Sequence, residues 1–379
     1  MKKHFSRRQI IKFFLKIGLS LFSILFGSKK IFKKRISSKQ MKIIKQITAL
    51  PESGPWPTID PFLFCVHHID KYPKANENFT PKASLKGRNI GNDFSNYEGW
   101  SMYHGESVPG FPKHPHRGFE TLTVVSKGTI DHSDSLGATA RFGDGDAQWL
   151  TAGDGINHSE MFPLFNQRSN NILDFFQIWI NLPSYSKRVE PNFQMFWKEQ
   201  IPTVNVKDKL GITSNIELIS GKFEGIDALE APPNSWAKNS NNHFAVWIIH
   251  LKSKGSFMLP KTIKGINRSI YVLKNSNIEL NEYSILPNSM IELFSEKNVN
   301  LYNNGNNTRI LMLQGRPINE PVEKYGPFVM NTRSEIEEAF YDYSRTGFGG
   351  WKWPNSGPIH GQYKGRFAKL INGDIERPE

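Results

Sequence analysis

Two short pairs of metal-ligand residues constrain the fold of this 379-residue chain more than any other feature. His114 and His116 are separated by one residue, and so are His158 and Glu160. On a β-strand this spacing directs both side chains of a pair to the same face of the sheet. Two neighbouring strands of this kind would bring three imidazoles and one carboxylate together. The pairs therefore predict β-structure with a set of metal ligands on one face.

The predicted ligand set suits a divalent transition metal, and Fe(II) is the metal we expect. Three nitrogens and one oxygen leave coordination positions open for water, substrate or O₂. A structural zinc site is usually closed and commonly contains thiolates, whereas the chain has a single cysteine, Cys65. The alternative is that these histidines are ordinary hydrogen-bonded residues of strands. The matched spacing and the turn glycines nearby, Gly118 and Gly155, favour the metal site.

Short apolar segments alternate with glycine- and aspartate-rich turns over residues 117–183. This rhythm is typical of an all-β sandwich or barrel and not of alternating βαβ units. A second β-rich block covers residues 244–314 and contains no paired ligands. Its two histidines, His243 and His250, are seven residues apart. On a strand they would point to opposite faces, so we interpret both as structural.

The segments around the β-rich blocks have their own signatures. Residues 70–112 are rich in Lys, Asn, Gly and Pro, which predicts a long loop that approaches the metal face. Residues 334–340 predict a helix with Asn331 or Thr332 as its cap and an acidic first turn. Residues 36–57 are polar and basic and are expected to form a linker.

The positive charge of the chain is confined to its beginning. Of the 48 Lys and Arg residues, 14 lie in residues 1–50, where there is no acidic residue. The remaining 34 are balanced by all 35 acidic residues. A nearly neutral globular part argues against nucleic-acid binding through a basic patch.

We interpret the basic N-terminal segment as a leader. Arg7 and Arg8 precede an apolar run from Phe13 to Gly27, which is too short for a comfortable membrane span. The segment resembles a twin-arginine export signal, so we expect an exported protein that is periplasmic or anchored to the membrane. Two features oppose export: no Ala-x-Ala site follows, and a basic cluster from Lys29 to Arg35 comes after the run. The alternatives are a surface-bound amphipathic helix and a cytoplasmic protein.

Several longer motifs extend the comparison to a known family. They are residues 114–121 (HPHRGFET), 132–137 (HSDSLG), 143–146 (GDGD), 148–153 (QWLTAG) and 155–160 (GINHSE), followed by 315–317 (GRP) and 325–332 (YGPFVMNT). Together they resemble the pirin family of the cupin superfamily. The resemblance is dense over residues 111–162 and looser through the second β-rich block.

The resemblance implies an all-β bicupin, in which two β-barrel (double-stranded β-helix) domains lie face to face. We expect a signal or anchor at residues 1–35, a linker at 36–57, a metal-binding cupin domain at 58–190, a cupin domain without metal at 191–320, and a short helix and tail at 321–379. The family's ligands fall on His114, His116, His158 and Glu160, the four residues selected by spacing. The export-like leader and the long 70–112 segment depart from compact members.

The resemblance also implies a function. Some pirins are dioxygenases that open the ring of a flavonol such as quercetin, which would make a small aromatic hydroxy-ketone and O₂ the substrates. Glu160 would then be both a ligand and the catalytic base, with Phe119, Trp149 and Phe162 as candidate walls or simply core residues. The alternative is a non-enzymatic, metal- or redox-sensing module that binds other proteins. A third interpretation is a cupin whose metal is purely structural.

Overall fold

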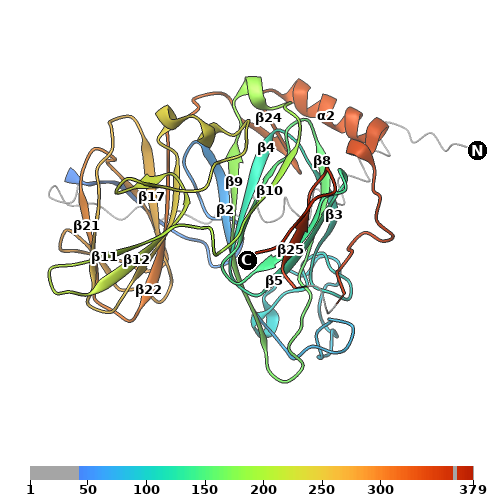
Figure 1. The fold of residues 1–379 in the computed structure, drawn as a ribbon, viewed down its shortest axis with the longest axis horizontal. Helices are drawn as coiled ribbons and strands as arrows, with labels where there is room; N and C mark the ends of the chain where they lie inside the picture. Colours follow the sequence, from blue (N-terminus) through green and yellow to red (C-terminus); the bar gives the residue numbers. More distant parts are fainter. Residues whose placement is uncertain (1–41, 362–364, 379) are drawn as a thin grey trace, which may run out of the picture.

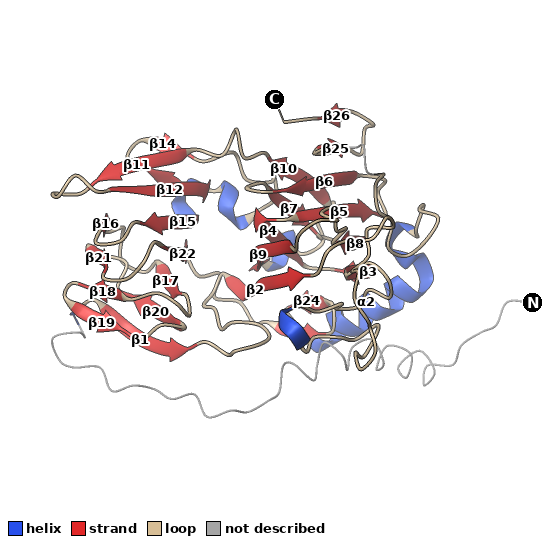
Figure 2. Ribbon diagram, turned by 90° about the horizontal axis from the view of Figure 1, so that it is seen from below, coloured by secondary structure: helices blue, strands red, loops and turns tan. Residues whose placement is uncertain are grey.

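The computed structural model describes residues 42–361 and 365–378, which form two β-barrels side by side (Figures 1 and 2). Each barrel consists of two antiparallel sheets packed face to face around an apolar core. The all-β fold with two barrels is therefore confirmed. The predicted leader, residues 1–35, lies outside the described residues. Within the described part, no helix is long and apolar enough to cross a membrane.

The first barrel contains a five-stranded and a six-stranded sheet. The order of the five-stranded sheet is β10 (Asn192–Phe196), β7 (Ala147–Thr151), β4 (Phe119–Lys127), β9 (Asn171–Asn181) and β2 (Phe62–Tyr72). The order of the six-stranded sheet is β26 (Ile375–Glu376), β25 (Phe367–Lys369), β6 (Thr139–Gly143), β5 (Thr129–Asp134), β8 (Ile156–Met161) and β3 (Gly110–His116).

The second barrel has the same design. Its larger sheet has the order β1 (Ile44–Ala49), β20 (Ser289–Leu293), β17 (Asn267–Val272), β22 (Thr308–Gly315), β15 (Ala245–Leu251), β12 (Thr213–Ser220) and β11 (Thr203–Lys207). Its smaller sheet has the order β16 (Ser256–Leu259), β21 (Val299–Asn303), β18 (Ile278–Leu280) and β19 (Tyr283–Ile285). The short hairpin of β13 (Lys222–Phe223) and β14 (Ile226–Asp227) lies between β12 and β15 in the chain.

The two barrels share a third apolar core between the five-stranded and seven-stranded sheets. The alternation along β4 explains it: Leu122 and Val124 point into this shared core, whereas Val125 belongs to the interior of the first barrel. Strand β4 is buried on both faces, and its polar side chains Glu120, Thr121 and Thr123 are buried as well. Because one continuous apolar core joins the two sheets, the barrels pack as one body. Its members from the two sheets include Leu122, Val124, Trp149, Phe176, Ile178, Val246, Ile248, Tyr271, Met290 and Leu311.

Each end of the described chain adds a strand to the barrel that is farther from it in the sequence. The expected linker at 36–57 contains strand β1, which pairs with β20 of the second barrel. The apolar side chains of Ile43 and Ile44 enter the core of that barrel and drive this pairing. At the other end, β25 of the expected tail pairs with β6 of the first barrel. Strand β10 likewise begins just past the boundary expected at 190 and pairs with β7.

The connecting segments complete the arrangement around the first barrel. Residues 73–109 lack regular strands and contain one short 3₁₀ helix, η2 (Tyr97–Gly99), in agreement with the predicted long loop. After the second barrel the chain forms the hairpin of β23 (Glu323–Tyr325) and β24 (Phe328–Met330), then helix α2 (Arg333–Thr346). The predicted helix and its Thr332 cap are confirmed, and Glu335 closes a capping box. The remaining 3₁₀ helices are η3 (Ser184–Ser186), η4 (Trp236–Lys238), η5 (Ser240–Asn242) and η6 (Gly347–Gly349).

Candidate metal centre

Strands β3 and β8 bring the two histidine pairs together inside the first barrel. They are antiparallel neighbours, and His114 is the register partner of His158. A bulge between Phe111 and His114 shifts the register just before the pair. Because residues 156, 158, 160 and 162 alternate toward the barrel interior, Ile156 and Phe162 pack in its core while His158 lies between them. The histidines are therefore fixed on rigid strands.

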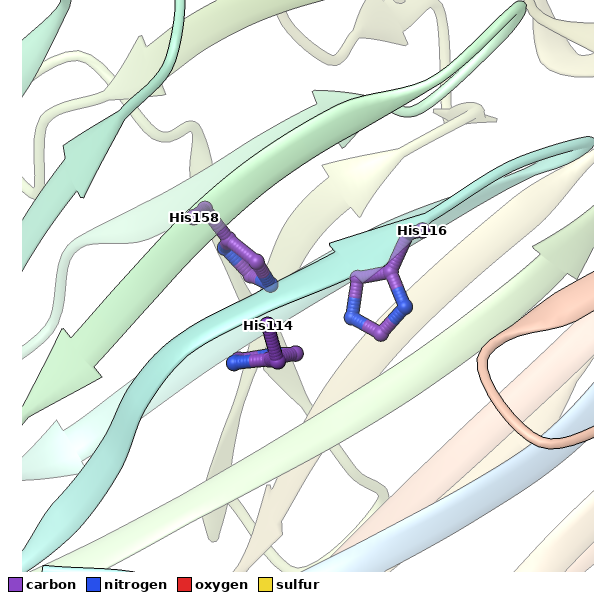
Figure 3. Close-up of side chains that lie close together, drawn as sticks. All are labelled: His114, His116 and His158. Atoms are coloured by element: carbon purple, nitrogen blue, oxygen red, sulfur yellow. The ribbon is translucent and has the colours of Figure 1, made fainter. Parts of the chain in front are cut away.

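The rings of His114, His116 and His158 converge (Figure 3). Their centroids are 4.4 Å apart for His114 and His158, 4.7 Å for His114 and His116, and 4.9 Å for His116 and His158. One nitrogen from each ring lies within 4.8 Å of the other two. In the described part of the chain, this is the one group of three or more His, Cys, Asp or Glu side chains that is close enough to share an ion.

The hydrogen bonds of the rings decide which nitrogens face the centre. His114 Nδ1 lies 2.9 Å from the Pro112 carbonyl oxygen, and His116 Nδ1 lies 3.4 Å from the Pro327 carbonyl oxygen. A carbonyl only accepts, so both Nδ1 atoms carry the hydrogen and both Nε2 atoms keep a free lone pair. This pattern, with the outer nitrogen bound to a carbonyl, is the usual support of a metal-ligating histidine.

His158 provides the strongest sign that a ligand is expected here. Its side chain is fully buried, yet neither ring nitrogen has a hydrogen-bond partner in the protein. An unpaired buried polar atom costs free energy, roughly 1–3 kcal/mol, and native proteins avoid it. A metal ion bound by the three rings would satisfy one of these nitrogens. The donor set therefore fits a divalent transition metal.

Burial also keeps the three rings in the metal-binding protonation state. It lowers the pKa of His114 to about 4 and holds the pKa values of His116 and His158 well below their usual range. Neighbouring imidazoles push in the same direction because a second positive charge nearby is unfavourable. The rings are consequently neutral near pH 7, and only a neutral imidazole offers a lone pair to a metal.

The predicted fourth ligand, Glu160, does not belong to the group of converging atoms. Its carboxylate accepts hydrogen bonds from Gln177 Nε2 at 2.8 Å and from Thr123 Oγ1 at 3.3 Å. Burial raises its pKa, an effect that nearby His132 and the two hydrogen bonds oppose. The carboxylate lies on the same strand face as His158, two residues along. Its part in metal binding stays a prediction.

A second buried pair lies beside Glu160 on strand β5. His132 is the register partner of Glu160, and its Nε2 lies 3.2 Å from Asp134 Oδ2. Asp134 Oδ1 accepts the backbone N–H groups of residues 136, 137 and 138 and so closes the turn to β6. The histidine ring stacks on Phe193, with the centroids 4.9 Å apart. The sequence motif at 132–137 indicated a turn there, but not that it borders the candidate centre.

Aromatic side chains form one wall of the candidate centre. The ring centroids of Phe119 and Trp179 lie 5.0 and 5.1 Å from that of His116, and the two rings stack 4.0 Å apart. Phe119 is thus placed as a wall, as the sequence suggested, while Trp149 packs in the core between the barrels. Gln177 and Trp179 were missed, although their alternation on β9 puts them on one face.

The long loop reaches the same region. His104 donates its Nδ1–H to the Gly91 carbonyl oxygen, 2.8 Å away, and this bond fixes the ring within the loop. Its ring lies 5.8 Å from that of Phe111, which in turn lies 6.3 Å from His114. Phe162, the third candidate wall, packs edge-on against Phe111. The loop therefore covers the Phe111 side of the centre, in line with the expectation for residues 70–112.

The two isolated histidines of the second barrel have ordinary partners. His243 Nδ1 lies 3.2 Å from Thr262 Oγ1, and the residue precedes β15 instead of lying on it. His250 is on β15 and its Nε2 lies 3.1 Å from Glu217 Oε1. Both contacts are ordinary hydrogen bonds between side chains.

Two family models match the chain, one described as pirin over residues 59–180 and one as the pirin C-terminal cupin domain over residues 246–349. A Pseudomonas aeruginosa protein provisionally named quercetin 2,3-dioxygenase is 34% identical over 240 residues, which cover 63% of this chain and 79% of that protein. The human protein named pirin is 32% identical over 254 residues, covering 65% of this chain and 81% of its own.

Among solved structures, one described as quercetin 2,3-dioxygenase from Acinetobacter baumannii is similar over both barrels. It is 26% identical and has a TM-score of 0.62, with 84% of this chain and 94% of that chain covered. The similarity extends over most of the chain and is not confined to the metal-ligand motifs.

Proposed function

The chain belongs to the pirin family, and from this premise we propose that it is a metal-dependent dioxygenase acting on an aromatic hydroxy-ketone of the flavonol class. The observation that carries the proposal is the buried cluster of His114, His116 and His158, whose free nitrogens converge with no protein partner for His158. The names of the Pseudomonas and Acinetobacter relatives support the choice of reaction. We propose Fe(II) as the metal.

The residues of the centre have different proposed roles in metal binding, ligand orientation and substrate binding. His114, His116 and His158 would hold a divalent metal, which would act as a Lewis acid that lowers the pKa of a substrate hydroxyl and would supply the site for oxygen chemistry. The three rings would hold that ion with neutral nitrogen donors. Pro112 and Pro327 carbonyls keep the His114 and His116 rings in one orientation. The stacked Phe119 and Trp179 rings offer an apolar face that suits a flat substrate.

Glu160 is the proposed proton acceptor. In its hydrogen-bonded position with Gln177 and Thr123, it lies inside the barrel and is shielded from water. Burial raises its pKa, which brings a carboxylate closer to the range in which it exchanges a proton with a substrate hydroxyl. We also propose that Glu160 supplies the fourth protein ligand, as its place on the strand face of His158 suggests.

The proposal is tested by oxygen uptake with purified, Fe(II)-loaded protein and a panel of flavonols and catechol-like compounds. Uptake that needs the flavonol and disappears in His116→Ala supports it. The matched control is His250→Ala, because His250 is half-exposed on the second barrel and should leave uptake unchanged. A protein that binds one metal but consumes no oxygen with any compound would favour the second candidate, a metal- or redox-sensing binding module.

A further inference from the structure

The segment after the second barrel returns to the first barrel and lies against the metal strand. Residue 328 forms a parallel bridge with Arg117, and the Val329 N–H donates to the Arg117 carbonyl at 3.0 Å. Arg117 directly follows His116. The residue before this bridge, Pro327, supplies the carbonyl oxygen that accepts the His116 ring hydrogen. The orientation of one candidate ligand thus depends on a part of the chain 211 residues away.

A buried lysine ties the two segments together. Lys187 is 1% exposed, and its ammonium group donates to the Gly118 carbonyl at 2.9 Å, to Asn181 Oδ1 at 2.7 Å and to the Val329 carbonyl at 3.3 Å. Gly118 belongs to the turn after His116, and Val329 belongs to the returning segment. The three donors of one ammonium group are therefore used on three oxygens from three elements.

The use of a charged group at this position needs an explanation. Burying an ammonium group costs free energy, and burial lowers the pKa of Lys187 to about 8. None of its three hydrogen-bond acceptors is a carboxylate; each is a neutral oxygen. A lysine that only filled space could be replaced by an apolar side chain without loss. Its contacts instead gather the turn after His116 and the strand that carries Pro327.

Arg117 makes a second tie, from the metal strand to helix α2. Its Nη1 donates to Asp342 Oδ2 at 2.9 Å, and its Nε donates to the Asp154 carbonyl at 2.7 Å. The guanidinium group lies over the ring of Phe348, 4.6 Å from its centroid. The helix and the residues after it are thereby fastened to the residue next to His116.

We propose that Lys187 is a positioning residue of the metal centre, which holds the returning segment 321–349 against the metal strand so that the Pro327 carbonyl fixes the ring of His116. The proposal rests on the metal-binding function proposed above. It assigns the returning segment to the centre itself, because without the segment the His116 Nδ1–H has no acceptor among the residues described here.

The test uses Co(II) as the probe and the variant Lys187→Met, which keeps the length of the side chain and removes its donors. Affinity is measured by competition with a chelator, and the ring N–H protons are followed by their Co(II)-shifted NMR signals. We expect affinity to fall about tenfold or more, the range found when outer partners of ligating histidines are removed. The N–H of His116 should exchange faster with solvent. The N–H of His114 should not, because its acceptor, Pro112, is on the same strand.

Two further variants keep the test decisive. Arg268→Met removes a buried cation of the second barrel that bonds Gln314 and Pro260, so it lowers stability without touching the centre. It should leave affinity and both signals unchanged. Asp342→Asn weakens the contact of α2 with Arg117, so it should lower Co(II) affinity and speed the His116 exchange while leaving the His114 exchange unchanged. If Lys187→Met does not fold, Asp342→Asn decides the question with the same two readouts.

The outcomes separate the two proposals. Native Co(II) affinity and unchanged His116 exchange in the Lys187 variant, or in Asp342→Asn if that variant alone folds, would overturn the positioning role while leaving the metal centre intact. Equal losses in Lys187→Met and Arg268→Met would also overturn it, since the effect would then be general destabilisation. If the wild-type protein shows no Co(II)-shifted histidine signals, the metal centre itself is wrong.

Discussion

His114 lies directly opposite His158 across strands β3 and β8, with their ring centroids 4.4 Å apart. Two imidazoles in such close contact inside a barrel are costly unless they share a ligand, because His158 has no hydrogen bond to offset its burial. Together with His116 they form the one converging donor group in the described chain. The predictions below follow from this arrangement and from the packing around it.

Glu160→Gln should weaken metal binding less than His116→Ala. The amide keeps an oxygen donor and its hydrogen-bonding capacity toward Thr123 and Gln177 but loses the negative charge. We expect a measurable fall in affinity together with loss of oxygen uptake. Metal analysis and a chelator competition check the first part. An affinity identical to that of the wild-type protein would show that Glu160 is not a ligand.

The free energy of unfolding should decrease as the pH is lowered, because His68 is buried in its neutral form. Burial lowers the pKa of this ring to about 3 from an unfolded value of 6.5, so the folded protein stays neutral there while the unfolded chain takes up a proton. The unfolded state therefore binds more protons between these two values, and stability is lost as the pH falls through about 6.5 toward about 3. Each such group contributes a slope of up to about 1.4 kcal/mol per pH unit.

The variant His68→Phe tests this directly, because it preserves the stacking on Phe175, where the ring centroids are 4.5 Å apart. Its urea-unfolding free energy should depend less steeply on pH between 6 and 4, although the lost contact with the Tyr103 hydroxyl lowers stability at every pH. A slope equal to that of the wild-type protein would contradict the prediction. The control is Leu210→Ala, which changes an exposed side chain without a titratable group and should leave the slope unchanged.

Leu122→Ala should destabilise both barrels together. Leu122 is fully buried in the core that the barrels share, and a buried Leu→Ala change costs about 2–5 kcal/mol. Thermal unfolding should remain a single transition at a lower temperature. Leu210→Ala is the matched control: this side chain is 77% exposed, so its change should stay within about 0.5 kcal/mol. Two separate transitions in the wild-type protein would show that the barrels unfold independently.

The export prediction concerns residues outside the described part of the chain. If the twin-arginine route is used, changing both Arg7 and Arg8 to Lys should retain the protein in the cytoplasm. The reverse exchange, Lys2 and Lys3 to Arg, should leave its location unchanged. Cell fractionation measures both. Normal export of the Arg7, Arg8 double variant would argue against this route.

The local part of the centre was predictable and the distant part was not. The period of two in His114-Pro-His116 and His158-Ser-Glu160 places side chains on one strand face, and that rule needs no knowledge of the fold. Pro327 and Lys187 act through a carbonyl and an ammonium group whose partners lie far away in the chain, so no spacing reveals them. Gln177 and Trp179 had a usable signal in the alternation of β9.

In the fold, too, local features could be predicted from the sequence and long-range packing could not. Alternating apolar residues and glycine-aspartate turns predicted the strands and the all-β class, and the Thr332 cap predicted where α2 begins. The composition of residues 36–57 predicts a linker and not strand β1, because lysines and polar residues outnumber the few apolar side chains, Ile43 and Ile44 among them, that enter the second barrel. Which barrel a terminal strand joins is decided by long-range packing, and composition does not contain that information.

The central claim is a single metal ion held by the three histidines of the first barrel. The most direct measurement is the metal content per chain of the wild-type protein and of His116→Ala, determined by elemental analysis after each is loaded with Fe(II) without oxygen. We predict a value near one for the wild-type protein and near zero for the variant, because losing one of three converging rings breaks both geometry and affinity. A wild-type value near two, or a variant that still holds a full equivalent, would contradict the account.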